Sequence, residues 1–257
     1  MGISSVIYLI VIFLICPVWG SSPSVPSMGE IGFTETLLEE FDAVKRLPAG
    51  GDTLRIALGD QYGILRVLEW EGRAFREVWR SRELRSPIRE VFVEDIDMDG
   101  RQEIIVYTTR GWILFFSVDT YERLWESPEN EYSSIRCMAL ANIDSDPQKE
   151  LIICSPAAIH AYDPIDHLEE WRSDRPYLAQ EMVVGDVDDD GVLELVLNTG
   201  PILDSRFFDL EWEGVDYGER IKLVDIDDDG IPEVIGQSAG RIISVYDIDM
   251  KQVKVPY

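Results

Sequence analysis

The sequence predicts an all-β fold, a β-propeller of about five four-stranded antiparallel blades. Three observations support this prediction: an acidic segment recurs four times, a tryptophan recurs in step with it, and short β-branched runs alternate with turn residues. A period near 40 to 50 residues with four strands per unit is typical of propellers, whose blades pack around a central axis in a closed ring. An open β-solenoid or sandwich is the alternative, although solenoid rungs are usually shorter.

The acidic segments carry the first marker of the repeat. They read DIDMDGRQEIIV, NIDSDPQKELII, DVDDDGVLELVL and DIDDDGIPEVIG, and their starts lie 47, 44 and 39 residues apart. The second marker recurs at intervals of 46, 46 and 41 residues: Trp79, Trp125, Trp171 and Trp212. The first tryptophan precedes the first acidic segment, which implies a repeat without an acidic loop. Five repeats are therefore predicted within a propeller domain over 33–257: 33–83, 84–131, 132–175, 176–217 and 218–257.

The repeats are built from short runs that are typical of strands, four in a complete unit. In the first repeat three such runs cover 54–58, 63–70 and 75–79, and the missing acidic loop fits a degenerate terminal unit. In the other repeats one run precedes the acidic loop, as in VFVED or MVVGD, and one follows it, as in EIIVY or ELVLN. A turn and a third run come next, as in WILFFSV, and the fourth run carries the tryptophan. Four consecutive strands predict one antiparallel blade.

The N-terminus predicts export. An almost wholly apolar stretch that ends near Gly20 reads as a signal peptide over 1–20, followed by a Ser/Pro-rich flexible leader over 21–32. The segment before the apolar stretch has no Lys or Arg, so an uncleaved N-terminal anchor is the alternative. The expected location is secreted or extracytoplasmic, with retention by that anchor as the alternative.

The charge of the chain excludes one class of partner. With 23 Lys and Arg against 49 Asp and Glu, the formal net charge is −26, which argues strongly against nucleic acid. Only Cys137 and Cys154 lie beyond the predicted signal peptide, on the two runs that flank the second acidic loop. A cross-strand disulfide and two free thiols both remain open at this stage.

The acidic segments predict cation sites. Oxygen-bearing side chains fall at positions 1, 3, 5 and 9 of each segment, and a backbone carbonyl at position 7 would complete the set. Calcium binds about six to eight oxygens, and alternate residues of a tight loop point inward around it. Up to four calcium ions are therefore expected, with these ligands: Asp95, Asp97, Asp99, Arg101 and Glu103; Asn142, Asp144, Asp146, Gln148 and Glu150; Asp186, Asp188, Asp190, Val192 and Glu194; Asp225, Asp227, Asp229, Ile231 and Glu233.

Repulsion between the carboxylates favours a bound cation over an acidic surface turn without metal. Four carboxylates within nine residues repel by about 1 kcal/mol per pair even in water at 4 Å, and only Arg101 and Lys149 bring positive charge into the loops. An EF-hand is excluded because its closing Glu at position 12 is absent and strand-like residues follow each loop. The second loop is expected to be the weakest, because Asn142 removes one charge and Pro147 replaces the position-6 glycine.

The segment MVVGDVDDDGVLELVL, with a strand, a GD-x-DxDG-xxE loop and a second strand, resembles the FG-GAP or VCBS repeats of integrin α-subunit-like propellers. The resemblance covers four of the five predicted repeats. It implies a structural calcium ion in the hairpin between the first two strands of a blade, and it says little about the ligand. Integrin-like propellers have seven blades, whereas five are predicted here.

The sequence shows no convincing catalytic constellation. The only histidines are His160 and His167, both expected to be structural, and the repeated tryptophans are expected to pack between blades. The favoured function is a non-enzymatic, monomeric, exported and calcium-stabilised module that binds an extracellular protein or glycan. The alternative is a carbohydrate-active hydrolase or lyase built on a propeller. Carboxylates outside the loops that converge on the central axis would favour the enzyme.

Overall fold

The computed structural model describes residues 41–50, 53–144, 146–249 and 252–254. In these residues all the secondary structure is β, with 20 strands, which confirms the predicted all-β class. The predicted signal peptide at 1–20, the leader at 21–32 and residues 33–40 of the first repeat lie outside the described residues. Within the described part of the chain, no helix is long and apolar enough to cross a membrane.

The strands form five four-stranded antiparallel sheets, and the strand order within each sheet follows the chain. The first sheet contains β1 (Phe41–Leu47), β2 (Arg55–Asp60), β3 (Leu65–Trp70) and β4 (Phe75–Arg80). The second contains β5 (Ile88–Glu94), β6 (Glu103–Thr108), β7 (Ile113–Ser117) and β8 (Arg123–Glu126). The third contains β9 (Cys137–Ala141), β10 (Glu150–Cys154), β11 (Ile159–Asp163) and β12 (Leu168–Arg172). The fourth contains β13 (Met182–Gly185), β14 (Glu194–Leu197), β15 (Pro201–Asp204) and β16 (Leu210–Glu213), and the fifth contains β17 (Arg220–Val224), β18 (Glu233–Gln237), β19 (Ile243–Asp247) and β20 (Gln252–Lys254).

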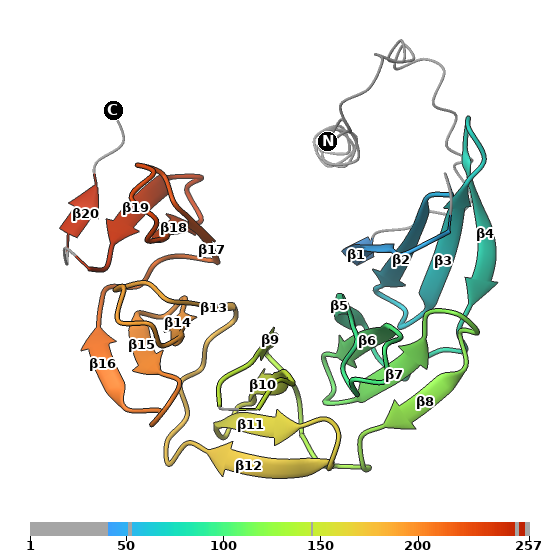
Figure 1. Cartoon of the computed structure of the whole chain (residues 1–257), viewed down its shortest axis with the longest axis horizontal. Helices are drawn as coiled ribbons and strands as arrows, with labels where there is room; N and C mark the ends of the chain where they lie inside the picture. Colours follow the sequence, from blue (N-terminus) through green and yellow to red (C-terminus); the bar gives the residue numbers. More distant parts are fainter. Residues whose placement is uncertain (1–40, 51–52, 145, 250–251, 255–257) are drawn as a thin grey trace.

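The five sheets stand side by side like the blades of a propeller. Their first strands, β1, β5, β9, β13 and β17, line the inner side of the arc, and the fourth strands lie toward its outside (Figure 1). The arc is open between the first and the last blade (Figure 1). The expectation of a closed ring is therefore wrong, because five repeats at the rotation set by blade packing cover only part of a circle.

The hydrophobic core lies between consecutive blades. The second strands of the three middle blades, β6, β10 and β14, are buried on both faces, so their apolar residues do not alternate with polar ones. In β6, Ile104 and Val106 pack in the cluster shared with the first blade, whereas Ile105 packs with Leu151 and Ile153 of the third blade. Blade stacking thus replaces a single central core, and it explains the continuous apolar runs in the sequence.

Three of the four recurrent tryptophans pack against a ring of the next blade, as predicted. The ring centroids of Trp79 and Tyr121 lie 5.4 Å apart, those of Trp125 and His167 lie 4.8 Å apart, and those of Trp171 and Phe208 lie 3.8 Å apart. The last two pairs are stacked with interplanar angles of 9° and 10°. Stacking accounts for His167 as a structural residue.

The remaining histidine and the cysteines also have structural surroundings. His160 is buried, with Nε2 2.9 Å from the Ser155 hydroxyl and Nδ1 against the Glu169 carboxylate. Cys137 and Cys154 face each other directly across β9 and β10, where both are buried free thiols. Of the two states left open by the sequence, the structure has the thiols.

Candidate metal centres

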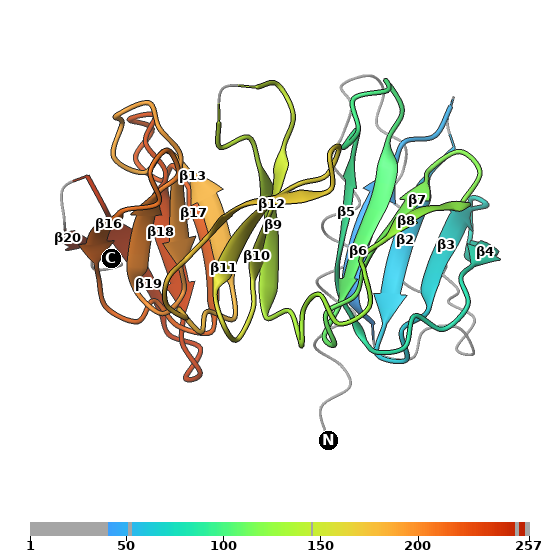
Figure 2. The same cartoon turned by 90° about the horizontal axis from the view of Figure 1, so that it is seen from below.

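The four acidic loops connect the first and second strands of the second to fifth blades. They follow β5, β9, β13 and β17, and because every blade runs in the same direction they emerge on one face of the arc (Figure 2). At the base of each loop the last residue of the first strand pairs with the first residue of the second strand, for example Glu94 with Glu103 and Gly185 with Glu194. The sheet therefore fixes both ends of each loop before any ion binds.

Left-handed backbone conformations fold the loops tightly. Position 4 has positive φ in three loops, at 59° for Met98, 63° for Asp189 and 62° for Asp228. Position 6 has positive φ in the same loops, with a glycine in each case: Gly100 at 87°, Gly191 at 81° and Gly230 at 98°. Glycine adopts this region without the steric cost that a Cβ imposes, which is the physical reason for its place in the motif.

A hydrogen bond from the position-6 amide orients the position-1 carboxylate. The N–H of Gly100 donates to Asp95 Oδ2 at 3.0 Å, and Gly191 and Gly230 make the corresponding bonds to Asp186 and Asp225 at 3.1 and 3.0 Å. Position 7 donates in the same way to the position-5 carboxylate, over 2.8 to 2.9 Å in all four loops: Arg101 to Asp99, Gln148 to Asp146, Val192 to Asp190 and Ile231 to Asp229. Each of these bonds uses one oxygen of a position-1 or position-5 carboxylate, so the second oxygen can contact another partner.

The second loop differs for a reason visible in its hydrogen bonds. Pro147 has no N–H, so it cannot donate to position 1. There Asn142 donates from Nδ2 to the carbonyl oxygen of Asp146, over 2.5 Å. In this loop the Asn142 side chain therefore stabilises the turn. In the other loops the backbone amide of the position-6 glycine does so. The two departures from the motif compensate each other structurally, and together they remove one carboxylate.

The predicted ligands are brought together in part. Carboxylate oxygens lie within 4.8 Å of one another in four groups drawn from the loops: Asp95, Asp97 and Asp99; Asp144, Asp146 and Glu150; Asp186, Asp188 and Glu194; Asp225, Asp227 and Asp229. Glu103 and Glu233 do not belong to the groups of their loops. Asp190 lies instead with Asp204 and Glu211, a group that the sequence did not predict because those two acids come from β15 and β16.

The position-9 glutamate is the most informative ligand candidate. It begins the second strand of its blade, and it is buried in every loop: Glu103, Glu150, Glu194 and Glu233. Its Oε2 accepts the N–H of position 2, over 2.8 to 3.0 Å: Ile96, Ile143, Val187 and Ile226. The other oxygen of Glu150 and of Glu194 is buried and has no hydrogen-bond partner among the described residues.

Burial and neighbouring carboxylates shift the pKa of three of these glutamates. Burial raises the pKa of Glu103 and Glu150 to about 7 and that of Glu194 to about 8. The backbone hydrogen bond lowers each pKa, while the nearby aspartates raise it further. A buried carboxylate oxygen without a donor is costly unless something positive faces it. The donor set consists of oxygens alone, which suits a hard cation such as calcium.

The inner side of the arc carries a second group of charges. Glu90 lies on β5, and desolvation by the surrounding protein raises its pKa. Lys222 and Lys45 lower that pKa and Glu181 raises it. Glu181 Oε2 accepts the N–H of Ile221 at 2.9 Å. Two carboxylates outside the loops therefore share this region with cationic side chains.

The chain is similar in fold to solved β-propeller-like structures. The Vibrio cholerae biofilm matrix protein Bap1 aligns at a TM-score of 0.59 with 19% identity, over 84% of this chain and 39% of Bap1. Saccharomyces cerevisiae Sqt1 aligns at 0.63 with 13% identity, over 85% and 61% of the two chains. Moraxella catarrhalis BamB aligns at 0.51 with 16% identity, over 83% and 63%.

The chain thus spans between about two fifths and about two thirds of the length of these three proteins. At such identities the likeness supports the propeller fold alone. No protein-family model matches the chain, and no curated protein sequence matches it.

Proposed function

We propose that this chain is an exported, calcium-stabilised β-propeller module that binds another protein, with metal loops of the FG-GAP or VCBS kind. The observation that carries the calcium assignment is the recurrent buried glutamate, which has an unpartnered oxygen in two loops and a raised pKa in three. Four divalent ions would offset eight of the 26 net negative charges. Each ion would join the two inner strands of one blade, a structural role.

An uncovered apolar sheet face favours a protein partner over a glycan. We define the terminal face as the side of the last blade that points away from the fourth blade, formed by Val224, Ile226, Ile235, Ile243 and Val245. Ile226 is 48% exposed, whereas its counterparts Ile96, Ile143 and Val187 are 1%, 9% and 1% exposed. Ile243 is 54% exposed, whereas its counterparts Ile113 and Ile159 are 1% and 0% exposed.

The chemistry of the terminal face indicates what would cover it. In the earlier blades the same positions are covered by the β-sheet of the next blade. Lys222 and Arg220 add positive charge at the inner edge of this face. The proposed occupant is therefore an apolar β-sheet face of a partner protein with acidic residues at its edge. A glycan would offer few apolar groups for this surface.

Two experiments test the proposal. Calcium titration of the metal-free protein by calorimetry, with magnesium as control, is expected to show saturable calcium binding and a raised melting temperature. Binding heat that does not saturate, or a melting temperature that calcium leaves unchanged, would reject the calcium assignment.

The terminal face is tested with partner proteins selected from a displayed library. These partners are expected to lose binding to the Ile243→Glu variant but not to the Leu168→Glu variant, which changes an exposed leucine on β12. Equal binding to both variants, or selection of glycans only, would reject the terminal face. If light scattering shows a dimer and Ile243→Glu makes it monomeric, the terminal face would instead bind a second copy of the chain.

A hydrolase or lyase is retained as a second candidate because Glu90 and Glu181, two carboxylates outside the acidic loops, interact electrostatically. Lys45 and Lys222 balance their charge, an arrangement that also suits simple ion pairing. Activity on a polysaccharide panel that Glu90→Gln abolishes would favour the enzyme, provided that the variant keeps the wild-type melting temperature.

Export is tested separately. Mass analysis of the protein recovered outside the cytoplasm is expected to show cleavage after Gly20, which lies in the predicted signal peptide. An intact N-terminus in a membrane fraction would favour the uncleaved anchor.

A further inference from the structure

The two free thiols lie at the junction between the third and fourth blades. Cys137 begins β9 and Cys154 ends β10, so the pair lies at the end of this hairpin that is farthest from the second acidic loop. Both residues are buried in the hydrophobic cluster that the two blades share. The folded protein therefore shields the pair from solvent.

Both thiols contact one backbone carbonyl at this junction. The carbonyl oxygen of Ala179 lies 3.8 Å from Cys137 Sγ and 3.7 Å from Cys154 Sγ, in the segment that leads from β12 to β13. Ala179 itself is completely buried. A thiol is a weak donor, but here two of them converge on a carbonyl that water does not reach.

The next blade has an amide at the corresponding place. Asn198 aligns with Cys154, and its Nδ2 donates to the carbonyl oxygen of Gly218 at 2.8 Å, in the segment that leads to the fifth blade. An amide keeps its hydrogens under oxidising conditions, whereas two adjacent thiols lose theirs when they form a disulfide. The contact between the third and fourth blades is therefore sensitive to oxidation, and the contact at the next junction is not.

The segment that the thiols contact has a strained backbone. Leu178 has a φ of 57°, in the left-handed region that a bulky residue adopts at a cost, and its side chain is 50% exposed. Burial of its own side chain thus does not hold it in place. On one side the N–H groups of Gln180 and Glu181 donate to Asn198 Oδ1 at 2.9 and 3.2 Å, and the thiols provide a second anchor at Ala179.

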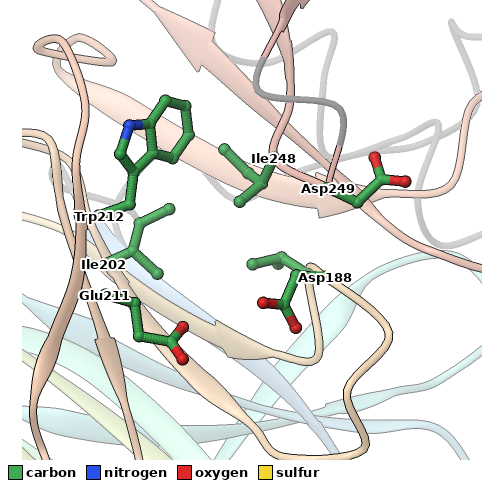
Figure 3. A pocket seen from close by; sticks show the side chains of 7 residues that line it. Asp188, Ile202, Glu211, Trp212, Ile248 and Asp249 are labelled. Atoms are coloured by element: carbon green, nitrogen blue, oxygen red, sulfur yellow. The ribbon is translucent and has the colours of Figure 1, made fainter.

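The outer end of the same junction is held separately. There the indole of Trp171 stacks on Phe208, with ring centroids 3.8 Å apart. At the next junction the corresponding Trp212 instead lines a pocket of about 450 Å³ with Ile202 and Ile248 (Figure 3). Because the Trp171 stack keeps the third and fourth blades together, a change at the thiols is expected to free the segment over 173–181 without separating the blades.

We propose that Cys137 and Cys154 form a redox switch that controls the mobility of the segment over 173–181. One cysteine thiolate attacks an external disulfide such as oxidised glutathione, which breaks the external S–S bond and releases one thiolate. The second cysteine thiolate then attacks the protein sulfur of the mixed disulfide, forms the Cys137–Cys154 bond and releases the other thiolate. The cysteine pair is oxidised, the external disulfide is reduced, and the two cysteine protons pass through solvent to the released thiolates.

Oxidation changes the junction because a disulfide has no S–H group. The buried carbonyl of Ala179 then loses both donors, and the strained turn at Leu178 loses one of its two anchors. Since the same segment covers the thiols, it must open before an external disulfide reaches them. The switch involves neither calcium nor a partner protein, so it does not rest on the proposed function.

The chemical step is tested on the full chain in glutathione buffers of increasing oxidising strength, quenched with acid and alkylated. Trypsin cuts after Arg136, Lys149 and Arg172, so the two cysteines fall in separate peptides, 137–149 and 150–172. We expect mass spectrometry to find both peptides alkylated in reducing buffer and linked to each other in oxidising buffer.

The effect on the segment is tested by amide hydrogen exchange of the reduced and the oxidised protein. Amides within 174–181 are expected to exchange about threefold faster or more after oxidation, the scale of losing one weak hydrogen bond. The segment over 214–219 is the internal control, because the Asn198 amide holds it and its exchange is expected to stay unchanged. A variant with both Cys137→Ala and Cys154→Ala is expected to exchange at the same rate in both buffers.

Each contrary result overturns the proposal. Peptides that stay unlinked in every buffer, or that each carry glutathione, would rule out the disulfide. Linked peptides with unchanged exchange over 174–181 would rule out the switch. An equal increase over 214–219 would show a general loss of stability instead of a local release, and a redox response that persists in the double alanine variant would show that other groups cause it.

Discussion

Replacing Glu194 by glutamine is expected to change stability in opposite directions with and without calcium. Glu194 is buried, accepts the N–H of Val187 at 2.8 Å through Oε2, and has no hydrogen-bond partner for Oε1 among the described residues. Glutamine keeps a carbonyl oxygen for the Val187 amide and removes the charge. Without calcium the substitution therefore relieves an electrostatic cost, and with calcium it removes a ligand charge.

The magnitude follows from the pKa of this glutamate. Burial raises that pKa from 4.5 to about 8, and one pKa unit corresponds to about 1.4 kcal/mol. At pH 7.5 the metal-free fold therefore loses up to about 4 kcal/mol to this residue, and relaxation and water entry reduce the measurable part. We expect Glu194→Gln to raise the free energy of unfolding by about 1–2 kcal/mol in the metal-free protein. In saturating calcium we expect a loss of about 1–3 kcal/mol, since removing one partner of a buried charge pair is costly.

The assay is urea unfolding at pH 7.5, followed by tryptophan fluorescence, in calcium and after exhaustive removal of calcium. Glu213→Gln is the matched control, because it removes an exposed charge from the neighbouring β16. The control is expected to shift both curves by less than about 0.5 kcal/mol. A Glu194→Gln variant that is destabilised equally in both conditions would refute the reasoning, because the glutamate would then act only as a hydrogen-bond acceptor.

Three further outcomes are expected. Since a raised carboxyl pKa means that the folded state binds more protons than the unfolded state, metal-free protein should gain stability as pH falls from about 8.5 to 6 in thermal melts; a flat or opposite trend would contradict this. The double variant Asn142→Asp, Pro147→Gly restores the carboxylate and the amide donor of the other loops, so calorimetry should show tighter calcium binding in the second loop, and unchanged affinity would contradict the motif argument. Trp171→Ala should cost about 3–5 kcal/mol in urea unfolding because its indole stacks on Phe208, and Trp212→Ala should cost less because its indole faces a pocket; equal losses would contradict this reading.

Much of the fold was predictable because the repeat makes each local pattern occur several times. Apolar runs on both sides of an acidic turn, such as MVVGD and ELVLN, specify two paired strands with a loop between them. Glycine at position 6 permits a left-handed turn, and all three position-6 glycines adopt it. The calcium ligands are a prediction that rests on the same local pattern, because positions 1 to 9 of one loop lie near each other whatever the rest of the chain does.

Contacts between distant parts of the chain were not predictable in this way. The group of Asp190 with Asp204 and Glu211 forms only because β15 and β16 fold back beside the third acidic loop. The interaction between Glu90 and Glu181 depends on how β5 and the segment before β13 are placed around the arc. The side-chain donation from Asn142 that replaces a missing glycine amide became visible only with the loop geometry.

The sequence by itself determined the strand pattern, the number of repeats and the chemistry of the acidic loops, because these follow from residue types at short spacing. Only the tertiary structure decided that the arc stays open, that Ile226 and Ile243 remain uncovered, and that Trp212 faces a pocket. The rotation between packed blades sets how far five blades reach around the axis. That rotation arises from side-chain packing across the four interfaces, and no single repeat encodes it.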